Sequence, residues 1–175
     1  MIPRKSKHIK HIPYYKQETG FTCGPAVLRM ALAGLGKKLS ERKIAQIAGT
    51  TSQKGTPNLN MIKCLKKLGV AHMMGYKMRY HDLMHYTKQG VTIIDWMPQL
   101  LFPAHPEFQR SPGFNPSEDS HYAIVISAGE KWVVLQDPVL GRRLRFLKKD
   151  FVNAWRDQIL DANRRMIAIL PRALE

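Results

Sequence analysis

The chain has 175 residues, of which 44% are hydrophobic, enough to build a single packed core. Its mean hydropathy is -0.31 and no apolar run approaches the ~20 residues of a membrane helix, so we expect a soluble protein without a transmembrane segment. Lysine and arginine number 28 against 13 acidic residues, which gives a net charge of +15. Nucleic acid, a membrane surface or an acidic polypeptide would all be attracted by this charge, so it leaves the partner open.

The N-terminal residues 1–12 are basic but are not followed by the apolar stretch and cleavage site of a secretory signal. We expect them to form a solvated arm in front of one domain that spans residues 13–175. Only two cysteines are present, Cys23 and Cys64, and their different surroundings are a poor basis for a disulfide. These features predict a cytoplasmic location.

The first two regular elements are predicted to be helices. The segment Cys23–Leu35 is apolar on most faces and has Pro25 in its first turn, which is typical of a buried helix. A second helix is predicted from Ser40 to Ala48, with Ser40 as its N-cap and Gly49 at its end. Cys23 is therefore expected at the N-terminus of a buried helix.

A third helix is predicted within residues 59–69, where apolar residues and lysines alternate with helical spacing. This spacing is expected to place Leu59, Ile62 and Leu65 on the face that packs on the core. Cys64 would lie beside them, and we interpret it as a packing residue.

The rest of the chain is predicted to be mostly extended, with two helices near residues 80–88 and 148–158. The expected strands are residues 70–76, 91–96, 121–127, 132–136, 142–146 and 166–170. A hairpin turn is expected around Gly129. N-terminal helices followed by an antiparallel sheet predict an α+β fold class.

Cys23 is the first candidate for chemistry. Unpaired backbone N–H groups and the helix dipole at a helix N-terminus favour an anion, so they favour the reactive thiolate of a cysteine placed there. Taken alone, however, Cys23 is equally compatible with a small buried residue.

His121 and Asp137 are candidates because two neighbouring strands begin and end with them. His121 opens the strand HYAIVIS after the polar, proline-rich segment 103–120, which we expect to be a long loop, and Asp137 closes the next strand. The two residues are symmetric about position 129 to within one residue, so antiparallel pairing would bring a carboxylate next to an imidazole. Asp137 is also followed by proline, and capping a turn would be an equally good reason for its presence.

Gln17 lies six positions before Cys23 in QETGFTCG, and its amide could help a backbone N–H to stabilise an oxyanion. By itself this signal is weak. The order Gln, Cys, His, Asp, with the cysteine at a helix start and the other two on paired strands, is far more specific than any single residue.

Several stretches resemble the bacteriocin-processing, double-glycine cysteine peptidases, a family of papain-like enzymes. They are IPYYKQETGFTCGPAVLRMAL, GTTSQKGTPNLNMIKCLKKLG, HYAIVIS, DPVLGRR and DFVNAW. The resemblance implies a papain-like fold in which Cys23, His121 and Asp137 form a triad and Gln17 completes the oxyanion hole. It also implies a peptide or protein substrate, such as a leader cut after Gly-Gly, and association with a transporter or membrane surface.

Two other functions are compatible with the same residues. A papain-like scaffold can transfer its acyl group to an amine or deamidate a side chain. A basic binding module with an inert triad is of a different class, but aromatic residues make up only 9% of the chain and are not interleaved with basic ones, which disfavours nucleic acid. No cofactor is expected, and the spacing of the cysteines and histidines indicates no metal site.

Overall fold

The structure is a computed structural model that describes residues 11–101, 106, 121–156 and 164–171. The helices in these residues are α1 (Cys23–Gly34), α2 (Glu41–Ala48), α3 (Asn58–Lys67), α4 (Tyr80–Gln89) and α5 (Lys148–Ala154), with a short 3-10 helix η1 (Pro98–Leu101). The strands are β1 (His72–Gly75), β2 (Val91–Trp96), β3 (His121–Ala128), β4 (Trp132–Asp137), β5 (Arg142–Leu147) and β6 (Arg165–Ile169). Each helix and strand predicted from the sequence is present, whereas η1 was not predicted.

The strands of the described residues form one six-stranded sheet in the order β1-β6-β2-β3-β4-β5. All neighbouring strands are antiparallel. The last strand, β6, lies between β1 and β2, so the sheet is not a simple meander. The predicted α+β class is confirmed, with the three N-terminal helices packed against an antiparallel sheet.

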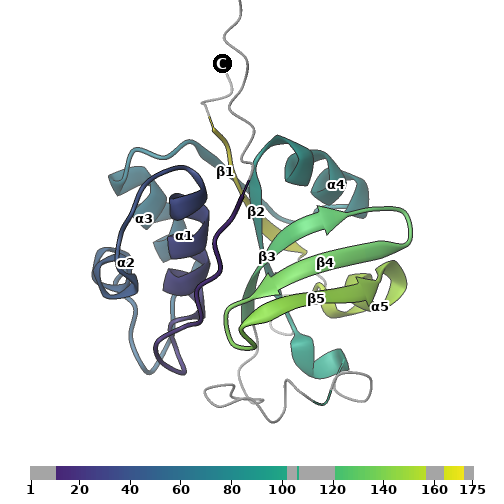
Figure 1. The fold of residues 1–175 in the computed structure, drawn as a ribbon, viewed down its shortest axis with the longest axis horizontal. Helices are drawn as coiled ribbons and strands as arrows, with labels where there is room; N and C mark the ends of the chain where they lie inside the picture. The colour runs from purple at the N-terminus through teal and green to yellow at the C-terminus, as the bar shows by residue number, and fades with distance from the viewer. Residues whose placement is uncertain (1–10, 102–105, 107–120, 157–163, 172–175) are drawn as a thin grey trace, which may run out of the picture.

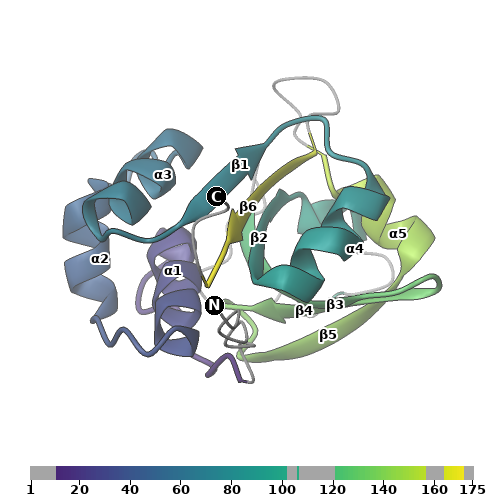
Figure 2. The same cartoon turned by 90° about the horizontal axis from the view of Figure 1, so that it is seen from above.

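Helices α1, α2 and α3 lie on one side of the sheet, and α4 and α5 lie on the other (Figures 1 and 2). Two cores result, and β2 contributes to both because successive side chains of a strand point to opposite faces. Ile93 packs with the N-terminal helices, whereas Ile94 packs with α4 and α5. Every residue of β2 is buried, as expected for a strand covered on both faces.

The start of α1 is held by close packing. Thr22 precedes the helix and makes no side-chain cap hydrogen bond, although its carbonyl accepts the Ala26 N–H at 2.9 Å. A Cβ atom on Gly24 would lie only 2.8 Å from the Cβ of Thr56, in the loop before α3. The first turn of α1 therefore approaches this loop to a distance that only glycine allows.

The predicted limits of α2 are confirmed, but one prediction for α3 is wrong. The Ser40 hydroxyl accepts the Lys43 N–H at 3.2 Å, and Gly49 ends α2 with φ 65°. In α3 the side chain of Leu59 is 63% exposed, whereas Met61, Cys64 and Leu65 are buried. Leu59 precedes Met61 by two residues, or about 200° around a helix, and therefore lies opposite the buried face.

Three further predictions concern the ends of segments. Helix α5 ends at Ala154, earlier than the predicted range 148–158. Only residues 11 and 12 of the predicted basic arm lie within the described residues, so its separation from the domain 13–175 stays a prediction. Of the predicted loop 103–120, the structure describes Pro106 alone.

Among the described helices, none is long and apolar enough to span a bilayer.

Candidate active site

Cys23 is the first residue of α1, as predicted, and 9% of its surface is exposed. The backbone N–H groups of the first helical turn have no partner further back in the helix, so the sulfur lies where an anion is favoured. Cys64 differs from Cys23 in its exposure. It belongs to α3 and is fully buried in the core that α3 shares with the neighbouring helices. Burial raises the pKa of the Cys64 thiol, with a partly opposing contribution from the charge of Lys67.

His121 is the first residue of β3 and is 4% exposed. Its Nε2 atom lies 2.8 Å from Oδ2 of Asp137. The Cys23 side chain lies close enough to the imidazole to raise the pKa of His121. Because Nε2 faces the carboxylate, Nδ1 is the ring nitrogen left for the sulfur. The structure therefore brings a thiol, an imidazole and a carboxylate from three separate elements close together, with the imidazole hydrogen-bonded to the carboxylate.

The register that joins β3 to β4 differs from the one predicted. Ile124 pairs with Gln136, and a bulge between Val125 and Ser127 shifts the register toward the hairpin turn. Continuing the pairing from Ile124 places position 137 opposite position 123, so His121 and Asp137 are diagonal neighbours and not a direct pair. Diagonal neighbours on one face are within reach of long side chains, and the contact forms in spite of the offset.

The charge state of His121 is set by opposing effects. Complete burial lowers the pKa of His121 because an imidazolium loses its hydration. The charge and hydrogen bond of Asp137 raise the pKa, and so do the hydrogen bond and charge of Cys23. The raising effects win, and they bring the pKa of His121 to about 10. A protonated imidazole at neutral pH is the partner that a thiolate requires.

Asp137 uses its two carboxylate oxygens for two different purposes. Oδ2 faces His121, while Oδ1 accepts the backbone N–H groups of Val139 at 2.8 Å and Leu140 at 3.1 Å. The Tyr14 hydroxyl donates to the backbone carbonyl of Asp137. The two explanations considered for Asp137 are therefore compatible, because this fully buried residue caps its turn and contacts the imidazole at once.

Gln17 is attached to the same turn through its backbone. Its N–H donates to the carbonyl of Pro138 at 2.9 Å. Its side-chain Nε2 donates to the carbonyl of Thr19 at 2.7 Å, and its buried Oε1 has no hydrogen-bond partner among the described residues. An amide carries two N–H bonds, so one donor remains for a substrate oxygen. The loop between Gln17 and Cys23 is thereby linked to the turn that follows Asp137.

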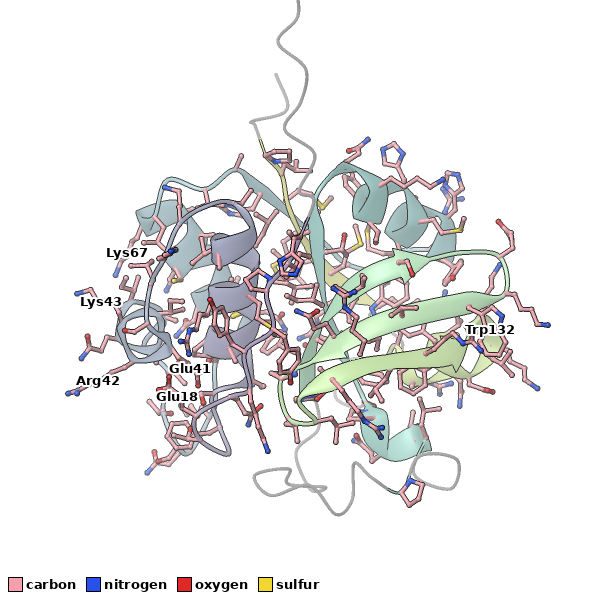
Figure 3. The ribbon with its side chains drawn as sticks, in the orientation of Figure 1. Glu18, Glu41, Arg42, Lys43, Lys67 and Trp132 are labelled. Atoms are coloured by element: carbon pink, nitrogen blue, oxygen red, sulfur yellow. The ribbon has the colours of Figure 1, made fainter. Side chains whose placement is uncertain are left out.

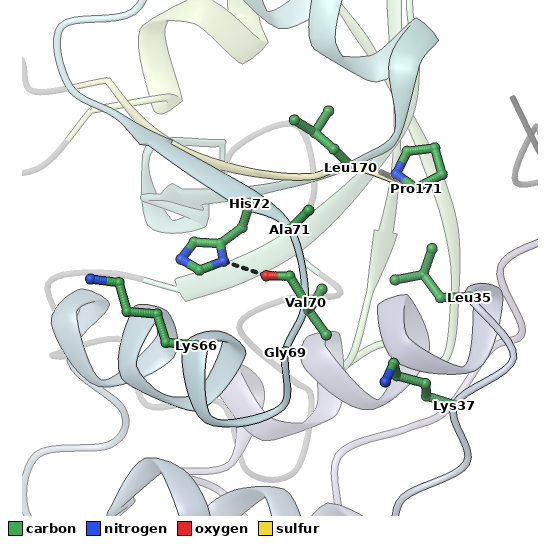
Figure 4. Close-up of a pocket in the computed structure, with 9 residues that line it drawn as sticks. All are labelled: Leu35, Lys37, Lys66, Gly69, Val70, Ala71, His72, Leu170 and Pro171. Carbon is green, nitrogen blue, oxygen red and sulfur yellow. Dashed lines mark hydrogen bonds between the residues drawn. The ribbon is translucent and has the colours of Figure 1, made fainter. Parts of the chain in front are cut away.

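A hollow of about 550 Å³ lies at the other end of α1 (Figure 4). Leu35, Val70, His72 and Leu170 are among its lining residues, and His72 Nδ1 lies 2.7 Å from the carbonyl of Val70. Helix α1 has 12 residues and is about 18 Å long, so this hollow is remote from Cys23. It is not part of the candidate active site. Among the described residues, no cluster of three histidine, cysteine or acidic side chains could hold a metal ion.

The fold is that of a papain-like cysteine peptidase domain. Residues 9–159 match the Peptidase_C39 like family, and the chain belongs to that family. The resemblance noted in the sequence is therefore confirmed at the level of the family.

Solved structures of peptidase domains share the fold. The peptidase domain of Streptococcus ComA, described as a bifunctional ABC transporter of a quorum-sensing pathway, has a TM-score of 0.67 and 21% identity over 93% of this chain and 100% of that one. A double-glycine motif protease from an AMS/PCAT transporter, solved with a leader peptide, has a TM-score of 0.68 and 17% identity over 95% and 96% of the two chains. A C39-like peptidase from Bacillus anthracis has a TM-score of 0.69 and 15% identity over 95% and 98%.

A sequence relative extends the match beyond the structures. An uncharacterized protein of Methanothermobacter marburgensis is 28% identical over 149 residues, which are 85% of this chain and 87% of the relative. The chain therefore corresponds to nearly the whole of that protein.

Sequence reasoning missed two residues that support the candidate site, Tyr14 and Glu41. Tyr14 contacts Asp137 across 123 positions of the chain. Glu41 accepts a hydrogen bond from the backbone of Glu18, in the loop before Cys23, although it belongs to the first turn of α2. No local motif marks either residue, because a partner so distant in sequence leaves no periodic or spacing signal.

Proposed function

We propose that the protein is a cysteine endopeptidase with Cys23 as nucleophile, His121 as general acid and base, and Asp137 as the group that orients His121. The grouping of Cys23, His121 and Asp137, in which His121 is hydrogen-bonded to Asp137 and lies beside Cys23, carries this proposal. A carboxylate bonded to one imidazole nitrogen fixes the ring so that the other nitrogen faces the nucleophile. The raised pKa of His121 favours an imidazolium beside a thiolate, the reactive pair of such enzymes.

In the first half of the reaction, the thiolate of Cys23 attacks the carbonyl carbon of the scissile peptide bond. The C–N bond then breaks, and the His121 imidazolium gives its proton to the departing amine. This leaves a thioester between Cys23 and the N-terminal part of the substrate. In the second half, neutral His121 takes a proton from water as the water attacks the thioester, which releases a carboxylic acid and regenerates the thiolate–imidazolium pair.

Gln17 is proposed to stabilise the oxyanion that forms in both halves, together with the backbone N–H of Cys23. Its free amide N–H supports this role, as does the attachment of its backbone to Pro138, next to Asp137. Preorganised donors of this kind stabilise the transition state without needing to reorient during the reaction.

The proposed substrate is a peptide cut after a Gly-Gly pair, in the manner of a leader peptide. Support comes from the family and from the structurally similar double-glycine protease that was solved with its leader. The net charge of +15 favours substrates that carry acidic residues. We further propose that the reaction takes place in the cytoplasm, which the two free cysteines support.

Mass spectrometry of peptide libraries that contain Gly-Gly sites tests the proposal directly. Wild type is expected to yield two fragments whose summed mass exceeds that of the substrate by one water. Cys23→Ala should yield neither fragment, while Cys64→Ala, a change at the buried second cysteine, should retain cleavage. A joined product would indicate acyl transfer, and a gain of about one mass unit without cleavage would indicate deamidation. Equal cleavage by wild type and Cys23→Ala would refute the mechanism.

A further inference from the structure

Glu41 is a buried carboxylate that the proposed chemistry does not use. It is the first residue of α2 and is only 1% exposed. A glutamate in the first turn of a helix is ordinarily solvated and interacts with the helix dipole. The side chain of Glu41 turns instead toward α1 and the preceding loop, where it lies beside Glu18 (Figure 3). Its environment therefore calls for another explanation.

The contacts of Glu41 reach both ends of the segment between Gln17 and Cys23. Oε1 of Glu41 accepts the backbone N–H of Glu18 at 2.8 Å, one residue after Gln17. The side chain of Thr22, the residue before Cys23, lies close enough to the same carboxyl to lower the pKa of Glu41. A single side chain of α2 thus holds the backbone beside the proposed oxyanion residue and lies next to the side chain that precedes the proposed nucleophile.

Thr22 also closes the segment on itself. Its hydroxyl oxygen accepts the Thr19 N–H at 3.1 Å and lies 3.0 Å from the Thr19 hydroxyl, and it can donate to the Thr19 carbonyl at 3.2 Å. Because Gln17 Nε2 donates to that same Thr19 carbonyl, the contacts of Thr22 extend to the amide of Gln17. A shift of Thr22 would therefore alter the placement of the Gln17 amide.

Burying this carboxylate is costly. Burial raises the pKa of Glu41, while hydrogen bonds from Thr22 and the Glu18 backbone lower it. Two charged groups also act on it, because the Glu18 carboxylate raises the pKa and Arg29 of α1 lowers it. Arg29 pairs with Glu18 at 3.1 Å, which limits the repulsion between the two acids. Oε2 of Glu41 has no hydrogen-bond partner among the described residues, a cost that an apolar packing residue would avoid.

We propose that Glu41 is a positioning residue that holds the Gln17–Cys23 segment in the geometry needed for oxyanion stabilisation. The inference rests on the peptidase function proposed above. Glu41 acts through Glu18 and Thr22 and does not touch the substrate. Its effect is on the placement of the donors around the oxyanion, where a displacement of about 1 Å can cost roughly 100-fold in rate.

Two variants of Glu41 separate positioning from mere packing. Glu41→Gln retains an oxygen that can accept the Glu18 N–H, so kcat is expected to stay within about threefold of wild type. Glu41→Ala removes the acceptor, and kcat is expected to fall roughly 10- to 100-fold with little change in KM. Glu130→Ala, at an exposed acid on the β3–β4 hairpin, is the matched control and should behave as wild type.

Two further measurements report on the segment itself. Alkylation of Cys23 by iodoacetamide needs no oxyanion hole, so Glu41→Ala should be alkylated at a rate close to that of wild type. Amide hydrogen exchange of residues 17–23 should be faster in Glu41→Ala and near wild type in Glu41→Gln. Slowed turnover with unchanged alkylation would locate the defect in the oxyanion contacts.

The outcomes distinguish failure of this inference from failure of the proposed function. If wild type cleaves peptides and Glu41→Ala matches it in kcat, the inference is wrong and the peptidase assignment stands. If no peptide is cleaved, the exchange experiment still decides, because unchanged exchange of residues 17–23 in Glu41→Ala would overturn the positioning role. Equal losses in Glu41→Gln and Glu41→Ala would also overturn it, since the retained acceptor would then not matter.

Discussion

His121 Nε2 lies 2.8 Å from Asp137 Oδ2 although the two residues are offset by two positions in the pairing of β3 with β4. The offset leaves Oδ1 of Asp137 pointing toward the next turn, where it accepts the N–H groups of Val139 and Leu140. The carboxylate is thus held from both sides, and its contact with the imidazole does not depend on the free rotation of an exposed side chain.

The divided role of Asp137 predicts that activity and stability can be separated at this position. Asp137→Asn loses the ion pair with His121 but keeps an oxygen that can accept from the turn, so its Tm should fall less than that of Asp137→Ala. The variant loses the charge that stabilises the imidazolium, and kcat should fall by about 10³ to 10⁴. Asp137→Ala should lose both activity and Tm. Peptide cleavage rates and thermal unfolding of the two variants check this, and equal Tm losses in both would contradict it.

The raised pKa of His121 predicts a specific dependence of stability on pH. An imidazole whose pKa rises from its ordinary value of 6.5 to about 10 on folding binds its proton more tightly in the folded state. Its stabilising interaction with Asp137 is fully present below pH 6.5 and is lost as the pH rises toward 10. The free energy of unfolding should therefore decline through this range, by at most about 1.4 kcal/mol per pH unit from this one group.

Denaturant unfolding between pH 6 and pH 10 measures this decline. The comparison is best made in a Cys23→Ala background, which removes the titration and oxidation of the thiol while keeping Asp137. His121→Ala in that background should show a flatter dependence over the same range. Parallel curves for the two proteins would mean that His121 does not carry a raised pKa.

Gln17 predicts a graded loss of activity. Gln17→Ala removes one proposed oxyanion donor and should lower kcat by about 10² to 10³, with KM little changed. Glu in place of Gln, a change of similar shape, brings a charge that repels the oxyanion and should be at least as harmful. Both variants should react with iodoacetamide at Cys23 as wild type does. A rise in KM without a loss of kcat would assign Gln17 to substrate binding instead.

Much of the fold could be predicted because its signals are local. Ser40 and Gly49 mark the ends of α2, and the periods of apolar residues distinguish the helices from the strands. The position of β6 between β1 and β2 could not be predicted, since the last strand carries no mark of its neighbours. Leu59 shows a related limit of prediction. Helical spacing predicts that α3 has an apolar face, but it does not show which apolar residues at the start of the helix lie outside that face.

The candidate site, like the fold, could be predicted from the sequence only in part. Cys23, His121 and Asp137 could be proposed from element ends and hairpin symmetry, yet the bulge between Val125 and Ser127 that sets the true register has no sequence signature. Glu41 could not be proposed at all. Its burial depends on the approach of α2 to the loop before α1, and such tertiary contacts are invisible to spacing.

The close approach of Gly24 to Thr56 predicts that the residue after Cys23 tolerates no side chain. In Gly24→Ala the new Cβ would lie 2.8 Å from Thr56 Cβ and 3.1 Å from Met61 Sδ, so the first turn of α1 must shift. Overpacking of this kind typically costs about 1–3 kcal/mol of stability, and the shift should also displace Cys23 and lower kcat. Gly129→Ala is the matched control, because its Cβ would meet only the Trp132 carbonyl at an ordinary 3.7 Å. Denaturant unfolding and peptide cleavage of both variants check the prediction, and it fails if Gly24→Ala is as stable and as active as Gly129→Ala.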